Sequence, residues 1–136
     1  MNNNNNTLNI YTDGASRGNP GESGAGAAIY NENNVLIDQI SKYLGKKTNN
    51  EAEYYAVLYS IRYLIEHKFT KANFYCDSQL LVKQMLGEYK VKAKTIIPIY
   101  EEIKAISQNL ELTFTWIRRE NNTVADSLAN KAIDEK

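Results

Sequence analysis

The chain has 136 residues, of which 43% are hydrophobic and 24% are charged. This balance is typical of a single globular domain and excludes an intrinsically disordered chain. Sixteen basic and sixteen acidic residues cancel. The net charge therefore does not indicate a nucleic-acid partner, and any such binding would depend on local patches.

The composition also bears on the compartment. The single cysteine, Cys76, excludes an internal disulfide and suits a reducing environment. No apolar run approaches the roughly 20 residues that span a membrane. Met1 is followed by five asparagines rather than by a recognisable signal peptide. We therefore expect a cytoplasmic protein without membrane association.

The N-terminal part predicts a tail followed by strands. Residues 1–7 form an asparagine-rich tail that we expect to be disordered, and residues 8–136 form the single domain. Alternating apolar residues predict three strands, at residues 8–13, 26–30 and 35–43. A segment dense in turn residues, 17–24, predicts a loop between the first two. The short link before the third strand favours an antiparallel hairpin.

The remainder predicts helices alternating with strands. A long helix from about residue 50 to 67 carries apolar residues at helical spacing, and Asn49 or Asn50 could cap it. Further helices are predicted at about 78–87, at 98–108 and from 123 onward, and strands at 73–76 and 112–117. This order is typical of an α/β fold with one mixed sheet between helices. The helical crossover should make the first strand and the strand at 73–76 parallel neighbours.

Acidic residues recur at the ends of these predicted core elements. Asp13 and Asp77 each follow a strand, so parallel pairing would place them side by side at the edge where α/β sheets bind ligands. Glu53 and Asp126 lie near helix starts, and periodicity alone does not bring them to the same point. Each acid taken singly also fits a turn or a helix terminus. Burying four ionised carboxylates is costly, and divalent metal ions would remove that cost.

The chain resembles ribonuclease H type 1 over residues 8–135. The matching segments occur in the order of that family: Thr12-Asp13-Gly14, Gly18-Asn19-Pro20-Gly21, Thr48-Asn49-Asn50 with Glu53, Asp77-Ser78-Gln79, Trp116-Ile117, and Ala125-Asp126 with Leu128-Ala129. The resemblance implies a ribonuclease H-like α/β fold: a five-stranded mixed sheet of order 3-2-1-4-5, with strand 2 antiparallel and helices on both faces. The stretch Gly87-Glu88-Tyr89-Lys90-Val91-Lys92 is similar to the compact archaeal and bacterial branch, which lacks the basic handle of some relatives.

The resemblance also implies the catalytic and metal-binding residues, which are Asp13, Glu53, Asp77 and Asp126. They would hold two Mg²⁺ ions, for which Mn²⁺ should substitute. Asp13 would bridge both ions, Glu53 and Asp77 would hold the ion on the leaving-group side, and Asp126 the ion that activates water. The expected reaction is hydrolysis of the RNA strand of an RNA–DNA hybrid, giving 5′-phosphate and 3′-hydroxyl ends.

Glu51 competes with Glu53 for the glutamate position. In the family the glutamate lies three residues after the asparagine pair, which corresponds to Glu53 here. Glu53 also precedes Val57 by one helical turn and so should point near the core side of the helix. Glu51 sits in the first turn, where a carboxylate can serve the helix dipole. We therefore predict a metal-binding role for Glu53 and a helix-terminus role for Glu51.

The same resemblance assigns residues to the substrate. Amides would reach the minor groove, where the ribose 2′-hydroxyl distinguishes RNA from DNA, and small residues would allow close backbone approach. These residues are Asn19, Asn49, Asn50 and Gln79, with Gly14 and Ser16. Candidates for phosphate contacts are Lys46, Lys47, Lys90, Lys92 and Lys94. Two alternatives remain: the enzyme could also cleave double-stranded RNA, or the protein could be a hybrid-binding module without catalysis. We expect no obligate protein partner.

One departure from the family concerns proton transfer. Many relatives carry a histidine in the loop before the last acid, whereas this loop reads Arg118-Arg119-Glu120-Asn121-Asn122 and the single histidine, His67, ends the long helix. Arg118 or Arg119 could stabilise phosphate charge, but an arginine cannot shuttle a proton.

The aromatic residues favour structural interpretations. Tyr55, Tyr59 and Tyr63 form a stripe that could stack on bases, although packing against a neighbouring helix is the favoured interpretation. Trp116 is predicted to lie in the core.

Overall fold

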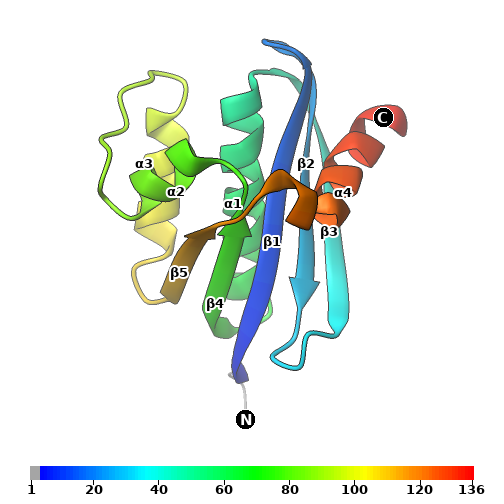
Figure 1. The fold of residues 1–136 in the computed structure, drawn as a ribbon. Coiled ribbons are helices and arrows are strands. Elements are labelled where there is room, and N and C mark those ends of the chain that lie inside the picture. Colours follow the sequence, from blue (N-terminus) through cyan, green and yellow to red (C-terminus); the bar gives the residue numbers. More distant parts are fainter. Residues whose placement is uncertain (1–3) are drawn as a thin grey trace.

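The computed structural model describes residues 4–136 and has one five-stranded mixed sheet at its centre (Figure 1). From edge to edge the strands lie in the order β3, β2, β1, β4, β5. Their bounds are β1 Asn4–Gly18, β2 Gly21–Tyr30, β3 Leu36–Lys47, β4 Phe69–Cys76 and β5 Glu111–Trp116. β2 runs antiparallel to β1 and β3, whereas β1, β4 and β5 are mutually parallel. The order 3-2-1-4-5 with strand 2 antiparallel is confirmed.

Helices cover both faces of the sheet, as expected. Their bounds are α1 Asn49–Glu66, α2 Gln79–Met85, α3 Ile97–Ile106 and α4 Thr123–Asp134, with a short 3₁₀ helix, η1, at Arg119–Asn121. α1 packs on β1, β2 and β4 with α2 and α3 beside it, and α4 crosses β2 and β3 on the opposite face (Figure 1). No helix within residues 4–136 is long and apolar enough to cross a membrane.

The connection from α2 to α3 is direct. Residues 86–96 form neither a helix nor a strand. The described chain therefore contains no additional helix between α2 and α3, which agrees with the compact branch.

The core forms between α1 and the sheet. The apolar stripe predicted on α1 is buried except at Ile65, which is 45% exposed. Its buried members pack on side chains that β1 and β4 direct to the same side: Tyr54, Val57, Leu58, Ile61 and Leu64 against Leu8, Ile10 and Phe74. The strands contribute every second residue to this face, as period-two alternation requires. This packing fixes α1 across the strands that carry Asp13 and Asp77.

β1 is longer than the sequence predicted. It begins at Asn4, which pairs with Phe69 of β4. The expectation of a disordered tail over residues 1–7 is therefore wrong for residues 4–7, because backbone pairing draws this polar segment into the sheet. Residues 1–3 lie outside the described part of the chain.

The loop predicted at residues 17–24 is instead a tight turn at Asn19-Pro20, with Gly18 paired to Gly21. Gly18 has φ +117°, a conformation that glycine adopts without the steric cost paid by other residues. Gly21 also pairs with Lys47 of β3. Pairing on both sides holds this glycine-rich segment in the sheet despite its local preference for turns.

Two predictions about aromatic residues are wrong. Trp116 is 41% exposed rather than buried in the core, and its indole N–H donates to the backbone carbonyl of Asp77 at 3.2 Å.

The tyrosine stripe of α1 lies against β3 rather than against a neighbouring helix. The Lys47 ammonium lies 5.6 Å from the ring centroid of Tyr55, and the Lys42 ammonium lies 5.9 Å from that of Tyr59.

Candidate active site

Strand pairing brings Asp13 and Asp77 together. Thr12 of β1 pairs with Cys76, the last residue of β4, and an aspartate follows each of them. Asp13 is 7% exposed and Asp77 is half-buried. The predicted juxtaposition of these two acids is confirmed. They lie where the parallel pairing of β1 with β4 ends: β4 stops at Cys76, whereas β1 continues past Asp13 to Gly18.

Glu53 joins them because α1 touches the backbone of β1 at Gly14. A Cβ atom on Gly14 would lie 2.3 Å from the backbone nitrogen of Glu53 and 2.4 Å from the carbonyl carbon of Ala52. Only glycine permits this approach. As a result, one carboxylate oxygen from each of Asp13, Glu53 and Asp77 lies within 4.8 Å of the others.

Asp126 approaches the same place from α4, in the first turn of that helix. It lies outside the group of three but lines the same hollow as Asp13, Glu53 and Arg119. The Asn130 amide donates to the Asp126 carboxylate at 3.3 Å and to its backbone carbonyl at 3.0 Å.

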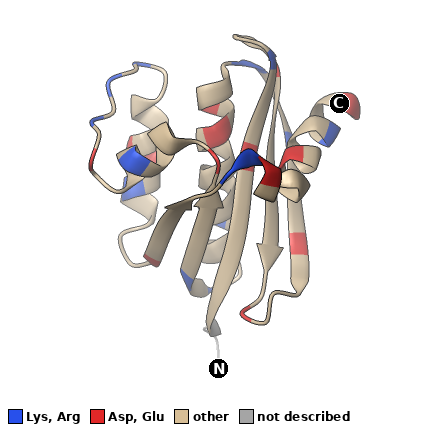
Figure 2. Cartoon of the chain, in the orientation of Figure 1, with Lys and Arg blue, Asp and Glu red and all other residues tan. Residues whose placement is uncertain are grey.

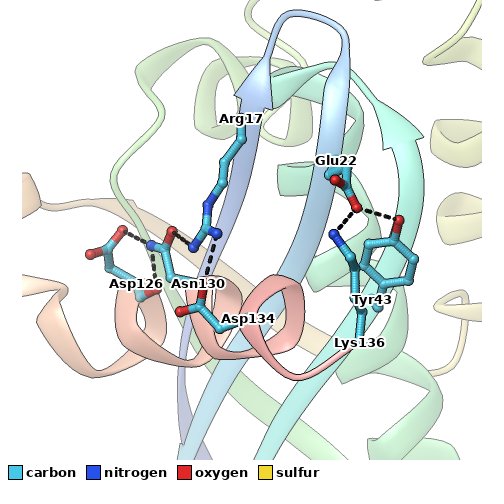
Figure 3. Close-up of polar contacts among 7 residues, drawn as sticks. All are labelled: Arg17, Glu22, Tyr43, Asp126, Asn130, Asp134 and Lys136. Atoms are coloured by element: carbon cyan, nitrogen blue, oxygen red, sulfur yellow. Dashed lines mark hydrogen bonds and ion pairs between the residues drawn. The ribbon is translucent and has the colours of Figure 1, made fainter.

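A second contact ties α4 to the β1–β2 hairpin. The Arg17 guanidinium donates to the side-chain amide oxygen of Asn130 at 3.3 Å and forms an ion pair with the Asp134 carboxylate at 2.7 Å (Figure 3). Figure 3 also shows Lys136 and the Tyr43 hydroxyl meeting Glu22 at the end of the same helix. These contacts hold the helix that carries Asp126.

Asp13 and Glu53 resist ionisation, because each has a raised pKa. Burial, followed by the charges of Asp77, Glu53 and Asp126, raises the pKa of Asp13 to about 8. Burial and the charge of Asp77 raise the pKa of Glu53 to about 7, although the Ser78 hydroxyl and the Arg119 charge oppose the rise. The ion pairs within the described residues do not include any of the four acids. The cluster therefore concentrates negative charge that a bound cation would neutralise.

The donor set fits hard divalent cations. It offers carboxylate oxygens alone, and oxygen ligands are those that Mg²⁺ and Mn²⁺ prefer. Basic residues lie on the segment leading into η1 and on the loop between α2 and α3 (Figure 2). Of these, Arg119 lines the hollow together with the acids.

Glu51 does not belong to the cluster. Its carboxylate accepts the backbone N–H of Thr48 at 2.9 Å, and its own N–H donates to the Thr48 hydroxyl at 3.1 Å. This reciprocal pair is a capping box. The helix-terminus role predicted for Glu51 is confirmed, and the cap is Thr48 rather than Asn49 or Asn50 because its hydroxyl reaches the free N–H.

Three of the predicted substrate residues border the acids. Asn49, Gly14 and Ser16 line the hollow, and the Asn19 side chain accepts the Asn49 backbone N–H at 3.1 Å. Asn50 and Gln79 lie in the first turns of α1 and α2. Contact of these residues with a substrate stays a prediction.

The two arginines before α4 are placed differently. Arg119 lines the hollow, and its charge opposes the rise in the pKa of Glu53, whereas Arg118 is an exposed residue just before η1. His67 lies at the far end of α1 against the ring of Tyr63, with centroids 4.1 Å apart.

The sequence did not single out Asn122, which contacts three parts of the site. It is 1% exposed, and its amide donates to the Thr12 carbonyl at 2.8 Å and to the Asp77 carboxylate at 3.1 Å. Its backbone carbonyl accepts the Asp126 N–H at 3.1 Å. Its side-chain oxygen is buried without a hydrogen-bond partner among the described residues. The one sequence signal was its position, four residues and so about one helical turn before Asp126.

Comparison with known proteins places the chain in a family. Residues 11–132 match the family model described as "Reverse transcriptase-like". The chain is 36% identical over 92% of its length to the "Bifunctional protein Rv2228c" of Mycobacterium tuberculosis, but it spans 35% of that protein. It is 30% identical to the "Ribonuclease H" of Francisella philomiragia, with 96% of this chain and 93% of the relative aligned.

A solved structure agrees with these relatives. The crystal structure of LC11-RNase H1 in complex with an RNA/DNA hybrid has a TM-score of 0.89 and 38% identity, covering 94% of this chain and 97% of that one. The fold, the order of the matching sequence segments and the alignments with relatives each extend over nearly all of the described residues. The chain belongs to the ribonuclease H type 1 family.

Proposed function

We propose that this protein is an endonuclease that hydrolyses the RNA strand of RNA–DNA hybrids with two divalent metal ions. The observation that carries the proposal is the convergence of Asp13, Glu53 and Asp77, whose oxygens lie within 4.8 Å of one another. A related structure, LC11-RNase H1, was solved with an RNA/DNA hybrid, which supports the choice of substrate.

The four acids would hold the cations. Asp13 is the most enclosed and faces the other three, so it is the group suited to bridge two ions. Glu53 and Asp77 would complete the leaving-group side and Asp126 the water side. When bound, the cations supply an activated water and neutralise charge on the departing oxygen.

The products follow from the bonds exchanged. A bond forms between the water oxygen and phosphorus, and the bond from phosphorus to the ribose 3′-oxygen breaks. The expected ends are a 5′-phosphate and a 3′-hydroxyl.

The chain's own residues would orient the strand. Asn49 and Ser16 border the acids on the side of the α1 N-terminus, where polar groups could meet a ribose 2′-hydroxyl, a donor and acceptor that DNA lacks. Arg119 lines the same hollow, where it offers a permanent positive charge and cannot accept a proton. Arg119 would therefore stabilise phosphate charge without serving as the general base.

Labelled substrates test this proposal. RNA–DNA hybrid, double-stranded RNA and double-stranded DNA would each be incubated with chelator, Mg²⁺ or Mn²⁺, and the ends analysed. We expect metal-dependent cleavage of the hybrid RNA strand with 5′-phosphate ends, and none with Asp13→Asn. Additional cleavage of duplex RNA would broaden the substrate. Hybrid binding without cleavage in either metal would overturn the proposal and favour a binding module.

A further inference from the structure

The outer edge of β3 is a free sheet edge that carries apolar side chains. β3 pairs with β2 on one side and ends the sheet on the other. Four large side chains on or next to it are between 40% and 56% exposed: Val35, Leu36, Ile37 and Tyr43. An unpaired edge with apolar residues is a template for pairing with another strand. The opposite edge, β5, exposes mainly polar residues, among them Glu111, Thr113 and Thr115.

The sequence of β3 is nearly symmetric about Ile40. Residues at equal distance from Ile40 on its two sides are alike or of opposite charge: Gln39 and Ser41 are polar, Asp38 and Lys42 are oppositely charged, and Ile37 with Tyr43 and Leu36 with Leu44 are apolar. In an antiparallel pair of two identical strands centred on Ile40, each residue would lie opposite its counterpart. Polar side chains would face polar ones, apolar side chains would face apolar ones, and Asp38 would face Lys42.

The directions of the side chains agree with this register. Directly opposed residues in an antiparallel pair project to the same face of the sheet. Lys42 lies over the Tyr59 ring and Asp38 interacts with Tyr63, so both point toward α1. Ser41, by contrast, donates to the Leu128 carbonyl of α4.

The backbone is regular where the pairing would form. Pairing of β3 with β2 is continuous from Asp38 to Tyr43, and the register shifts fall at Ile37 and Leu44, just outside this stretch. An uninterrupted segment offers outward-facing N–H and C=O groups at constant spacing. The continuous stretch therefore coincides with the inner part of the symmetric sequence.

We propose that two copies of this chain pair through their β3 edges, antiparallel and centred on Ile40, to form a dimer with one continuous sheet. Such a two-fold interface presents the same patch from both copies, which is the commonest arrangement in homo-oligomers. Each dimer contains two Asp38–Lys42 pairs and covers the exposed apolar residues. Asp13 on β1 and Asp77 after β4 are separated from this edge by β2, and Glu53 and Asp126 lie on α1 and α4 rather than on β3. The interface therefore uses none of the four acids.

Charge reversal tests both the interface and its register. Asp38→Lys and Lys42→Asp each place like charges opposite one another twice in a homodimer. We expect either variant to weaken self-association about tenfold or more in sedimentation equilibrium. Glu111→Lys makes a matched reversal on the β5 edge and should associate like the wild type.

Mixing the two variants distinguishes a lost contact from a damaged fold. The Asp38→Lys copy is basic at both positions, and the Lys42→Asp copy is acidic at both. In a mixed dimer every basic side chain of one copy would therefore face an acidic side chain of the other. The mixture should form a heterodimer, and the double variant should again form a homodimer. Melting curves would show that each variant is folded.

Hydrogen exchange tests the interface in the wild-type protein, without any substitution. Backbone amides of β3 that face outward should exchange more slowly as the wild-type concentration rises. A wild-type protein that stays monomeric at high concentration, single variants that associate like the wild type, or a mixture without heterodimer would overturn the proposal.

Discussion

Asp13 stands at the centre of the acidic cluster, and the neighbouring acids make its environment unfavourable for a charge. Burial and three nearby carboxylates raise its pKa to about 8. Like-charged groups this close favour the protonated state of one of them. A bound divalent cation would reverse this preference, because it stabilises the ionised form. The same geometry that is unfavourable in the absence of metal is therefore suited to metal binding.

Replacing Glu51, in the first turn of α1, or Glu53, two residues later, with glutamine should have different outcomes. Glu53→Gln removes a charge from the cluster, so we expect turnover at saturating Mg²⁺ to fall at least a hundredfold, roughly 3 kcal/mol of barrier. Glu51→Gln keeps the capping hydrogen bonds, since glutamine serves a capping box as well. Its turnover and melting temperature should stay close to the wild type. Hybrid cleavage rates of the two variants would decide, and the reverse ranking would contradict the assignment of Glu53.

Asn122 should influence activity by positioning Asp77. Asn122→Ala removes two buried hydrogen bonds, which we expect to lower the free energy of unfolding by about 1–3 kcal/mol. The Mg²⁺ concentration for half-maximal activity should also rise, because Asp77 loses a donor 3.1 Å away. Asn122→Asp keeps the shape but adds a negative charge there, so it should be less active than Asn122→Ala at equal Mg²⁺. Unchanged Mg²⁺ dependence in both variants would limit Asn122 to a structural role.

The strands show how far sequence reasoning reaches and where it stops. Alternation in residues 8–13 and 73–76 identified the inner parts of two strands, which extend in the structure to Asn4–Gly18 and Phe69–Cys76. A crossover through α1 sufficed to bring Asp13 beside Asp77. The extension of the β1–β2 hairpin was missed because Gly18, Gly21 and Gly24 signal turns locally. In the structure Gly18 pairs with Gly21 of β2, and Gly21 and Gly24 also pair with β3, so all three are strand residues. Pairing between distant segments leaves no local pattern in the sequence.

The positions of Glu53 and Asp126 depended on the packing of helices rather than on periodicity. Glu53 reaches the cluster because Gly14 lets α1 touch β1, and α4 approaches β2 over Gly24 and Gly26. Neither contact follows from spacing along the chain, so family resemblance was needed to place both acids. Asn122 was missed for the same reason, since its partners on β1 and after β4 are distant in sequence.

Packing of α4 on β2 should be sensitive to a single methyl group. A Cβ atom on Gly26 would lie 2.3 Å from the Ala125 carbonyl oxygen and 2.5 Å from the Ala129 nitrogen. Gly26→Ala must therefore displace α4, and we expect a loss of about 1–3 kcal/mol in the free energy of unfolding. Activity should fall as well, because Asp126 follows Ala125.

A second glycine provides the control for this substitution. Gly87 has φ +79°, and nothing lies within 4 Å of an added Cβ. Gly87→Asn should be mild, since asparagine tolerates left-handed backbone. Chemical denaturation and hybrid cleavage of both variants would test the difference. A Gly26→Ala protein as stable and active as the wild type would show that α4 is not held at this contact.

The molecule as a whole has no net charge, yet its charges are separated locally. Acidic side chains meet where the pairing of β1 with β4 ends, while basic residues lie on the loop between α2 and α3 and before η1 (Figure 2). A nucleic-acid backbone could contact these basic residues while its scissile phosphate lies near the acids. Binding should accordingly weaken as salt is raised.

Stability of the whole domain without metal should fall as pH rises. The folded-state pKa values of Asp13 and Glu53 are raised to about 8 and about 7 from ordinary values of 3.8 and 4.5. Between the ordinary and the raised values the folded protein binds more protons than the unfolded chain, so raising the pH lowers the free energy of unfolding. Below the ordinary values this effect is absent, and above the raised values it is complete.

Melting temperatures measured in chelator from mildly acidic to mildly alkaline pH would test this dependence. Mg²⁺ or Mn²⁺ should restore stability at the alkaline end, because a cation that binds only the folded state stabilises it. Asp13→Asn should flatten the metal-free pH dependence and reduce the gain from metal, whereas Glu51→Gln should change neither. A metal-free melting temperature that rises over this interval would mean that the acids do not share one charged site. Any stabilisation by Mg²⁺ or Mn²⁺ would then not come from relief of repulsion among these acids.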